Sequence, residues 1–255
     1  MKIATWNING LRARMDCVLH WLQARQPDVV GFQELKMADE VFPTETFEAL
    51  GYHVHVHGQK AWNGVAILSK QPANVTQTGL PGQEELGSRL ITAEIGDLSF
   101  TTVYCPNGKN LEHADYARKL QWFDALSAYM QPVVAASKHT VICGDFNICP
   151  TGLDSWDDGI QLGGMFHTDA ERERMTNLYN LGLRDLYREQ HPDAQMFSWW
   201  DYRAGSFQRN HGLRIDFMLA CANTQASNTE IDRDYRKKID GLTASDHAPV
   251  ITVLA

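Results

Sequence analysis

The stretch "TVICGDFNICP", residues 140–150, joins an apolar run directly to an acid and an amide. The residues from Thr140 to Cys143 are apolar or β-branched and predict a buried β-strand. Asp145 and Asn147 follow that strand. Acids and amides after a strand often only form a turn, because their side chains bond the local backbone. The stretch alone therefore leaves a turn and a functional site open, and the rest of the chain has to decide.

Segments of the same kind recur along the chain, and several show the period of two that is typical of half-buried strands. The predicted strands are residues 2–6, 28–33, 52–56, 64–69, 89–95, 98–104, 139–144, 214–220 and 248–254. Apolar faces at helical spacing lie between them, at residues 11–22 and 120–130. We expect the first helix to end before Pro27, and a third helix to begin at the capping box of Thr168 and Glu171.

No linker, repeat or low-complexity stretch divides the chain. With 44% hydrophobic residues it can bury a sizeable core. Many strands with intervening helices are typical of two sheets packed together with helices outside. We therefore expect an α/β fold in a single catalytic domain, residues 1–255.

The net charge of −8, from 31 acids against 23 bases, counts against a nucleic-acid partner when it is taken globally, because contact with phosphates needs a positive surface. A small basic face is nevertheless enough for an enzyme that must release its substrate, and acids gathered around a metal lower the total. The charge leaves this question open.

The remaining composition indicates a soluble cytoplasmic protein. No apolar run approaches the roughly 20 residues of a membrane span, and the first residues enter an apolar strand and lack the apolar core of a signal peptide. The five cysteines are odd in number, scattered and without a C-x-x-C pair, which argues against a disulfide framework and a thiolate zinc site. We interpret them as reduced packing residues.

Polar side chains stand where the predicted strands end. They are Asn7, Glu34, Tyr104, Asp145 and Asn147, and Asp246 and His247 stand just before the last strand. Sheets of α/β folds build their sites at such ends. Carboxylates and amides suit a hard cation such as Mg²⁺, which also shares substrate phosphate oxygens, and an imidazole can donate a proton to a phosphate oxygen or accept one. The pattern favours metal-assisted hydrolysis of a phosphodiester.

Two other kinds of site compete with this interpretation. His53, His55 and His57 lie on one face of a predicted strand, and His-x-His pairs can bind zinc. Successive positions on one face of a strand are about 7 Å apart, so we prefer a solvated face with Val54 and Val56 inside. A Ser/His/Asp hydrolase would lack its G-x-S-x-G turn, and Gly-rich phosphate loops are absent from the sequence too.

Eight segments, taken in order along the chain, resemble one family. They are "TWNINGLRAR" (5–14), "PDVVGFQELK" (27–36), "NGVAILSK" (63–70), "VYCPN" (103–107), "GDFNICPTGLD" (144–154), "FSWWDYR" (197–203), "GLRIDFMLA" (212–220) and "SDHAPV" (245–250). The set resembles the exonuclease III branch of the endonuclease/exonuclease/phosphatase superfamily, which includes the apurinic/apyrimidinic (AP) endonucleases of base excision repair. The resemblance implies a four-layered α/β sandwich, two packed β-sheets flanked by helices.

The resemblance also implies roles for the polar residues. The implied catalytic residues are Tyr104, Asp145, Asn147, Asp216 and His247, and the implied metal ligands are Asn7, Glu34 and Asp246, with Asp145 and Asn147 added in schemes with a second ion. The cofactor is Mg²⁺, for which Mn²⁺ can substitute. Asp145 would handle the proton of the attacking water or of the leaving oxygen, and His247, oriented by Asp216, would contact the scissile phosphate. Which of Asp145 and His247 is the general base stays open.

By the same resemblance, the partner is double-stranded DNA with nicks, 3′ ends or abasic sites, and the protein is a monomer that binds no membrane. The implied DNA-binding residues are Arg12, Trp62, Asn107, Trp199, Leu213 and Ile215, of which the last three would line the pocket for a baseless sugar or a terminal 3′ nucleotide. Bases in or beside the motifs would make the active face positive, or be ordinary solvated residues: Arg12, Arg14, Lys36, Lys60, Lys109, Arg203, Arg209 and Arg214. Trp200 is a candidate for packing on a sugar or base, or for the core.

His167 is the candidate specificity residue, because it precedes the helix cap in a loop that, by resemblance, borders the sugar pocket. An imidazole in the pocket would reject an internal abasic sugar and accept a 3′-terminal group; alternatively, it packs against the first helical turn. We expect a 3′–5′ exonuclease, 3′-phosphodiesterase or 3′-phosphatase of DNA repair with weak AP endonuclease activity. The alternatives are a full AP endonuclease, a phosphatase or lipid phosphodiesterase of the same superfamily, or a catalytically silent DNA-binding protein.

Overall fold

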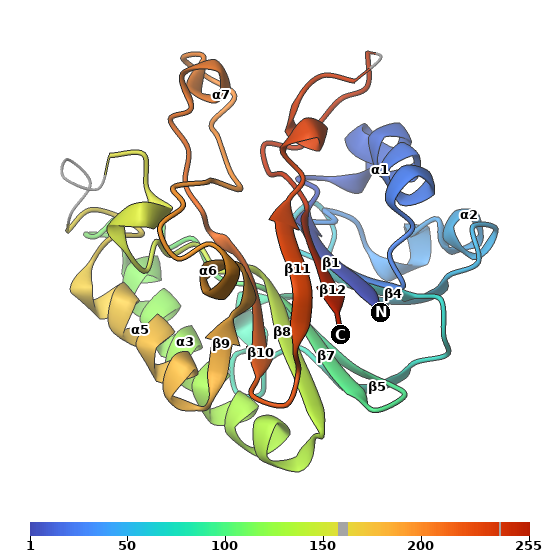
Figure 1. Cartoon of the computed structure of the whole chain (residues 1–255), viewed down its shortest axis with the longest axis horizontal. Helices are drawn as coiled ribbons and strands as arrows, with labels where there is room; N and C mark the ends of the chain where they lie inside the picture. Colours follow the sequence, from blue (N-terminus) through green and yellow to red (C-terminus); the bar gives the residue numbers. More distant parts are fainter. Residues whose placement is uncertain (158–162, 240) are drawn as a thin grey trace.

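Two β-sheets pack face to face, and helices cover their outer faces (Figure 1). The computed structural model describes residues 1–157, 163–239 and 241–255. Each sheet contains six strands. The resulting layers of helix, sheet, sheet and helix confirm the predicted four-layered α/β sandwich.

The first sheet has the strand order β11-β12-β1-β2-β4-β3. These strands are β11 (Ala226–Ile231), β12 (Val250–Leu254), β1 (Lys2–Asn7), β2 (Val29–Gln33), β4 (Val65–Ser69) and β3 (His53–His57). Strands β1 and β2 are parallel, with Asn7 opposite Gln33, and the other pairs are antiparallel. Asn7 and Glu34 therefore stand at the same edge of the sheet.

The second sheet has the strand order β5-β6-β7-β8-β10-β9. These strands are β5 (Asn74–Thr78), β6 (Leu90–Ile95), β7 (Leu98–Tyr104), β8 (His139–Asp145), β10 (Asp216–Cys221) and β9 (Leu183–Asp185). The parallel pair β7 and β8 sets Tyr104 opposite Asp145, and the antiparallel pair β8 and β10 sets Asp216 opposite Asp145. Three residues far apart in the sequence thus meet at one edge.

The outer helices differ in length and in the sheet that they cover. Helix α1 (Leu11–Arg25) and the short α2 (Thr44–Glu48) pack on the first sheet, and α3 (Ala114–Ala136) and α5 (Asp169–Asn180) pack on the second. The shorter elements are α6 (Leu186–Gln190), α7 (Ser206–Arg209) and the 3₁₀ turns η1 (Asp39–Val41), η2 (Glu84–Leu86), η3 (Gly152–Asp154) and η4 (Arg233–Arg236). Helix α1 ends before Pro27, and Thr168 caps α5 through the predicted capping box.

Alternation along each strand divides the apolar side chains among three core layers. In β1, Ile3 faces the second sheet, whereas Trp6 belongs to the core under α1. In β8, Val141 and Cys143 lie between the sheets, and Ile142 packs toward α3. Residues 141–143 are continuously apolar because both faces of this strand are covered.

Several smaller predictions concern side-chain environments. All five cysteines are free and buried, as expected of packing residues. Val54 and Val56 pack against the core under α1, but His55 and His57 are half-buried, and burial lowers the pKa of both. The predicted solvated histidine face is therefore only partly right. Within the residues described, no helix is long and apolar enough to cross a membrane.

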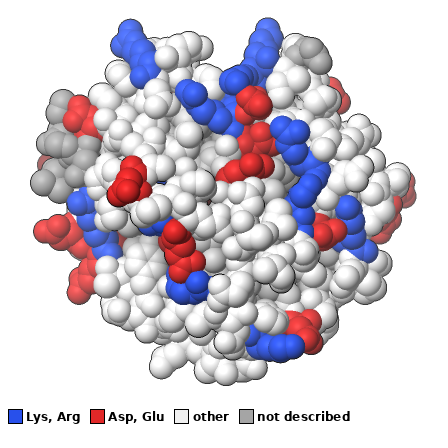
Figure 2. Space-filling model, viewed as in Figure 1, with Lys and Arg blue, Asp and Glu red and all other residues white. Residues whose placement is uncertain are grey.

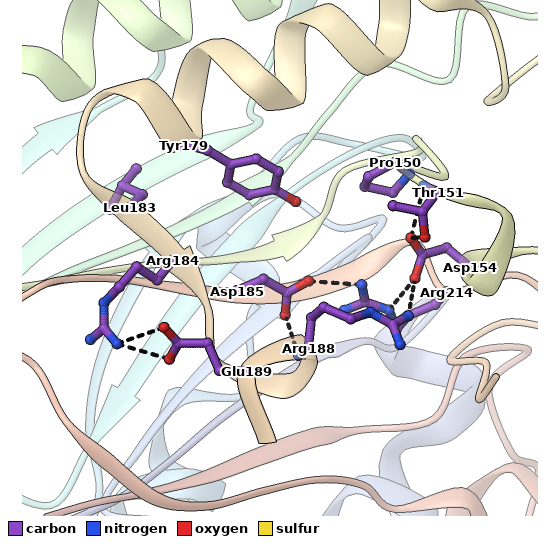
Figure 3. Close-up of a pocket in the computed structure, with 10 residues that line it drawn as sticks. All are labelled: Pro150, Thr151, Asp154, Tyr179, Leu183, Arg184, Asp185, Arg188, Glu189 and Arg214. Atoms are coloured by element: carbon purple, nitrogen blue, oxygen red, sulfur yellow. Dashed lines mark hydrogen bonds and ion pairs between the residues drawn. The ribbon is translucent and has the colours of Figure 1, made fainter. Parts of the chain in front are cut away.

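A buried ion-pair network lies behind the strand that carries Asp216, beside a cavity of about 280 Å³ (Figure 3). Arg214 is 1% exposed and donates from Nε to Asp154 at 2.7 Å and from its terminal nitrogen to Asp185 at 2.7 Å. Asp154 also pairs with Arg188 at 2.7 Å. Arg214 therefore neither makes the active face positive nor is an ordinary solvated residue, because its charge is paired inside the protein.

Replacing Asp154 with Asn should lower the free energy of unfolding by about 3 kcal/mol or more, because it leaves part of a buried guanidinium charge uncompensated. The matched control is Asp201→Asn, which removes the partner of the exposed Arg203 and should change stability by less than about 1 kcal/mol. Urea denaturation of both variants measures the difference. Equal, small losses would show that the Arg214 network does not stabilise the fold.

Candidate active site

The strand ends of both sheets meet around a cavity of about 190 Å³. Its lining residues are Glu34, Tyr104, Asn107, Asp145, Asn147, Phe166, Trp199, Ile215, Asp246 and His247. In the view of Figure 2, acidic and basic side chains lie side by side below the notch at the upper edge of the molecule, and further basic side chains stand at the tips on both sides of the notch.

His247 is held between two carboxylates. Its Nδ1 lies 2.8 Å from Asp216 Oδ2, and its Nε2 lies 3.8 Å from Asp145 Oδ2. Ser198 Oγ donates to the same Asp216 oxygen at 2.6 Å and accepts the Asp216 backbone N–H. All four residues are at most 3% exposed. Asp216 thus lies against the imidazole, the position that the family resemblance implied, and Ser198, which lies in the segment "FSWWDYR" but was given no role there, joins the pair.

Burial and charge act in opposite directions on the protonation of this pair. Burial alone lowers the pKa of His247, but the Asp216 and Asp145 carboxylates outweigh it and raise this pKa to about 10. Burial raises the pKa of Asp145 to about 8; the positive charge of His247 opposes this, and the charges of Asp216 and Glu34 add to it. His247 is therefore an imidazolium at neutral pH, whereas Asp145 changes its charge near neutral pH.

Asn7 connects the carboxylates of the two sheets. Its Nδ2 donates to Glu34 Oε1 and to Asp145 Oδ2, each at 2.9 Å. Ligand atoms of Glu34, Asp145 and His247 lie within 4.8 Å of one another, and among the described residues this is the group of three with metal-ligand spacing. Both nitrogens of a protonated His247 are donors, so the carboxylates of Glu34 and Asp145 are the members of this group that can bind the ion. The raised pKa of Asp145 indicates that further positive charge is favourable here. The residues fit a divalent cation, and Lys36, 2.9 Å from Glu34 Oε2, supplies one positive charge.

Asp246 lines the same cavity, but protein donors hold both of its oxygens. Oδ1 accepts from Asn9 at 2.8 Å, and Oδ2 accepts from Trp199 Nε1 at 2.9 Å. Burial raises the pKa of Asp246, but the charge of His247 and these two bonds outweigh burial and lower it. Asp246 is therefore an ionised neighbour of the metal-binding group rather than a member of it. Asn9 was missed from the sequence, because an asparagine so close to Asn7 resembles a turn residue.

Asn147 is fixed by three contacts. Its N–H donates to Asp145 Oδ1 at 3.0 Å, its Nδ2 donates to the Cys105 carbonyl at 3.0 Å, and its carbonyl accepts from Lys119 Nζ at 2.7 Å. Its φ of +50° and that of Glu34, +54°, lie in the left-handed region; asparagine adopts this conformation readily, whereas for glutamate it is disfavoured by about 1 kcal/mol or more. Strained residues of this kind persist where surrounding contacts hold them, and they cluster at functional sites.

Tyr104 presents a neutral phenol to the cavity. Burial, and then the negative charges of Glu34 and Asp145, raise the pKa of Tyr104 well above its usual value. The Arg89 guanidinium lies 4.8 Å from the centre of the tyrosine ring, and its NH1 donates to the Tyr104 carbonyl at 3.2 Å. Tyr104 is therefore a hydrogen-bond donor throughout the neutral range, with Arg89 holding it from behind.

The expected DNA-binding residues occupy different positions around the cavity. Asn107, Trp199 and Ile215 line it. Leu213, which is 7% exposed, lies behind it in an isolated bridge with Trp199. Trp62 is 69% exposed and, with Asn107, lines a neighbouring cavity of about 330 Å³. These residues are brought to one side of the molecule, although only some of them reach the catalytic cavity.

The expected basic residues divide by exposure. Arg12, Lys60, Lys109, Arg203 and Arg209 are exposed, whereas Arg14 and Lys36 are half-buried. Two of the exposed bases already have acidic partners, since Lys109 pairs with Asp115 and Arg203 pairs with Asp201. Trp200 is fully buried and belongs to the core.

His167 is not part of the cavity wall formed by the described residues. It is 1% exposed, and its Nδ1 lies 2.7 Å from the Met165 carbonyl oxygen. The preceding residue, Phe166, lines the cavity instead. Its φ of +70° is a backbone conformation that no local pattern predicts, so the sequence located the loop but not the side chain that reaches the site.

The combination of a four-layered α/β sandwich with carboxylates, amides and an ion-paired imidazole at one sheet edge is characteristic of a class of phosphoester hydrolases. The sequence profile of the Endonuclease/Exonuclease/phosphatase family matches residues 4–247. The chain is 37% identical over 267 aligned positions to the exodeoxyribonuclease III of Haemophilus influenzae, and the alignment covers 98% of each chain. The chain therefore belongs to the endonuclease/exonuclease/phosphatase family, whose members depend on divalent metal ions.

Solved structures give the same result. The chain superposes with a TM-score of 0.96 on a structure of the 3′ phosphatase NExo from Neisseria bound to a product DNA hairpin; the identity is 34%, and the match covers 100% of this chain and 99% of that one. An AP endonuclease from Archaeoglobus fulgidus matches with a TM-score of 0.93 and 32% identity, over 100% of this chain and 99% of that one. The predicted family is confirmed.

Replacing Asp216 with Asn should lower the pKa of His247 from about 10 toward its ordinary value near 6.5, because the strongest attraction is lost while burial remains. NMR titration of the imidazole in metal-free protein measures this. Because the folded pKa is raised, the charged ring stabilises the fold fully below about pH 6.5 and loses this contribution as the pH rises through about 10. The stability lost in Asp216→Asn should shrink over the same range. An unchanged imidazole titration would contradict the assignment.

Proposed function

We propose that this chain is a Mg²⁺-dependent phosphodiesterase of DNA repair that hydrolyses 3′ termini in double-stranded DNA. The observation that carries the proposal is the group of Glu34, Asp145 and His247, whose ligand atoms lie within 4.8 Å of one another at the cavity. Relatives over the full chain, at 32–37% identity, are an exodeoxyribonuclease III, a 3′ phosphatase and an AP endonuclease. The chain is accordingly a DNA-processing hydrolase of the exonuclease III type.

The protonation states support separate roles for the two central residues. Asp145, with a pKa of about 8, is a base matched to neutral pH and takes the proton of the attacking water. His247, with a pKa of about 10, stays charged and stabilises the negative oxygens of the scissile phosphate. Asp216 orients the imidazole through Nδ1. This division favours Asp145 over His247 as the general base.

Asn147 and Tyr104 complete the set. With its Nδ2 bound to the Cys105 carbonyl, Asn147 has its amide oxygen left to orient the attacking water. The neutral phenol of Tyr104 donates to a phosphate oxygen. Both side chains line the cavity with Asp145, which places a base, a water-orienting group and a phosphate donor around one point.

Glu34 would hold the metal ion, with Asn7 and Asp246 near it, and a scheme with a second ion would use Asp145 and Asn147. A bound divalent cation supplies positive charge that offsets the charge developing on the phosphate oxygens. Oxygen ligands predominate, so Mg²⁺ is the expected ion and Mn²⁺ a substitute. The raised pKa of Asp145 supports a bound cation, because added positive charge would stabilise the ionised carboxylate.

The preferred substrate is duplex DNA with nicks, 3′ ends or abasic sites. A cavity of about 190 Å³, walled by Trp199, Ile215 and Phe166, has room for one terminal sugar. An internal abasic sugar carries DNA on both sides and needs a more open wall. The exposed Trp62 offers a stacking surface, and the exposed Arg12, in the first turn of α1, offers a phosphate contact.

The same proposal includes the setting in which the protein works. Five free, buried cysteines fit a reducing compartment, for which we propose the cytoplasm. A family match over residues 4–247 and a core shared by both sheets support one catalytic domain over residues 1–255. We propose that this domain acts as a monomer.

Release of phosphate from a nicked duplex with a 3′-phosphate tests the activity. It should occur with Mg²⁺ or Mn²⁺, stop with excess chelator and return when the metal is restored. Asp145→Asn and His247→Ala should lower turnover by about 100-fold or more, because each removes a proton-transfer or charge-stabilising group, while DNA binding is retained. Asp201→Asn, which changes a half-buried acid outside the cavity lining among the described residues, is the control. Full activity in excess chelator would refute the metal-dependent function.

The preference for 3′ ends is tested by comparing the 3′-phosphate nick with a duplex that contains an internal abasic site. The wild type should favour the nick. Phe166→Ala should raise cleavage at the internal site by about tenfold or more. Truncating the ring opens the cavity wall, and a steric change of this size alters the relative transition-state binding of two substrates by about 1–3 kcal/mol. His167→Gly should give a smaller gain, because that ring is buried behind the wall. Strong internal cleavage by the wild type would identify a full AP endonuclease instead.

A further inference from the structure

A lysine and a glutamate form a fully buried ion pair beside the cavity. Lys119 in α3 and Glu171 in α5 are each 0% exposed, and Lys119 Nζ donates to Glu171 Oε1. Replacing such a pair with apolar residues is often neutral or stabilising, so a buried ion pair is weak evidence for a role in stability. Its other contacts indicate what this pair does.

The ammonium group of Lys119 contacts two parts of the cavity wall. Nζ donates to the Asn147 carbonyl at 2.7 Å and lies 4.8 Å from the centre of the Phe166 ring. The lysine stem also packs beside the loop that follows β7, because a Cβ on Gly108 would lie 3.1 Å from Lys119 Cδ. An ammonium has three donors and no acceptor, which suits a carboxylate, a carbonyl and an aromatic face at once.

Both wall residues have backbones that must be held in place. Asn147 has a φ of +50° and Phe166 a φ of +70°. The left-handed region is uncommon for residues with a Cβ and is an outlier for a bulky side chain such as phenylalanine. The Phe166 carbonyl accepts the Cys149 N–H at 2.7 Å, which fixes the backbone. Lys119 lies over the ring of Phe166, and so supports the side chain.

Glu171 is itself fixed at the start of α5. Its Oε2 accepts from the N–H and the hydroxyl of Thr168, whose Oγ1 accepts the Glu171 N–H. Tyr116 in α3 connects to the same cap, with its hydroxyl 2.6 Å from Thr168 Oγ1. The carboxylate that binds Lys119 is therefore part of a rigid junction between α3 and α5.

We infer that Lys119 and Glu171 are a positioning pair, which holds Asn147 and Phe166 at the cavity and thereby sets both turnover and the preference for 3′ ends over internal sites. The inference deepens the proposed function and rests on it. Neither residue lines the cavity among the residues described, so the pair acts through Asn147 and Phe166 rather than by touching DNA.

A double-mutant cycle of Lys119→Met with Phe166→Ala tests this inference. Methionine keeps much of the lysine stem and removes the charge. In the wild-type background, Lys119→Met should raise the ratio of cleavage at an internal abasic site to cleavage at a 3′-phosphate nick by about tenfold. A change of this size is within the range of interaction energies measured between residues in contact. It should also lower kcat on the nicked duplex with little change in KM. Without the hydrogen bond from Lys119, Asn147 shifts from the position in which it orients the attacking water.

In the Phe166→Ala background, Lys119→Met should leave the substrate ratio unchanged within about twofold, because the ring through which it acts is absent. An effect of Lys119→Met that does not pass through Phe166 would instead change the ratio equally in both backgrounds. That result, or an unchanged ratio in the wild-type background, would overturn the inference.

The matched control is Lys138→Met, which removes a lysine from an exposed pair with Asp97 and should leave ratio and turnover at wild-type values. If Lys119→Met does not fold, Lys119→Met/Glu171→Gln takes its place with the same expected results, because it leaves no buried charge. A wild type that cleaves neither substrate would refute the proposed function and this inference together. Cleavage by the wild type with an unaltered ratio in the lysine variant would refute the positioning role alone.

Discussion

The mutual burial of Asp145 and His247 at the edge where two sheets meet is the constraint on which the site depends. Both residues are at most 3% exposed, and the carboxylates of Asp216 and Glu34 stand close to them. Burial reduces the screening by solvent, so each negative charge raises the proton affinity of its neighbours. One arrangement of charges therefore produces an imidazole that is charged at neutral pH, a carboxylate that titrates near neutral pH and an attraction for a cation.

The two sheets hold this cluster of charges in place. Asp145 sits opposite Tyr104 and Asp216 in strand registers fixed by backbone hydrogen bonds, so repulsion between carboxylates cannot relax by moving them apart. Just beyond the strands, Glu34 and Asn147 adopt positive φ, so surrounding contacts have to hold these loops as well. Contacts from outside the cavity, such as those of Lys119 with Asn147, are what hold these loops. Rigidity at the strands and support behind the loops are parts of one design for precise positioning.

Sequence patterns located the parts of the site that follow directly from strand periodicity. Asn7, Glu34 and Asp145 were predicted as site residues because a polar residue that follows a buried strand lies at the edge of the sheet, where α/β folds build their sites. Loop geometry was not accessible in the same way. The choice of Phe166 over His167 depends on one backbone dihedral. Charged residues inside the motifs were equally ambiguous. The sequence could not show that Arg214 is paired inside the protein, because its buried partners are 60 and 29 residues away along the chain.

The net charge of −8 is compatible with a DNA substrate for a physical reason. At about 0.1 M salt, charges interact over roughly 10 Å, so phosphates at the cavity respond to its immediate surroundings and not to the far side of the protein. There, the acids of the site attract metal ions, and the exposed bases are Arg12 in α1, Lys60 in the loop after β3 and Arg209 in α7. Few phosphate contacts also mean modest affinity. Modest affinity favours release of a repaired end. An acidic total charge with a few exposed bases is therefore compatible with turnover.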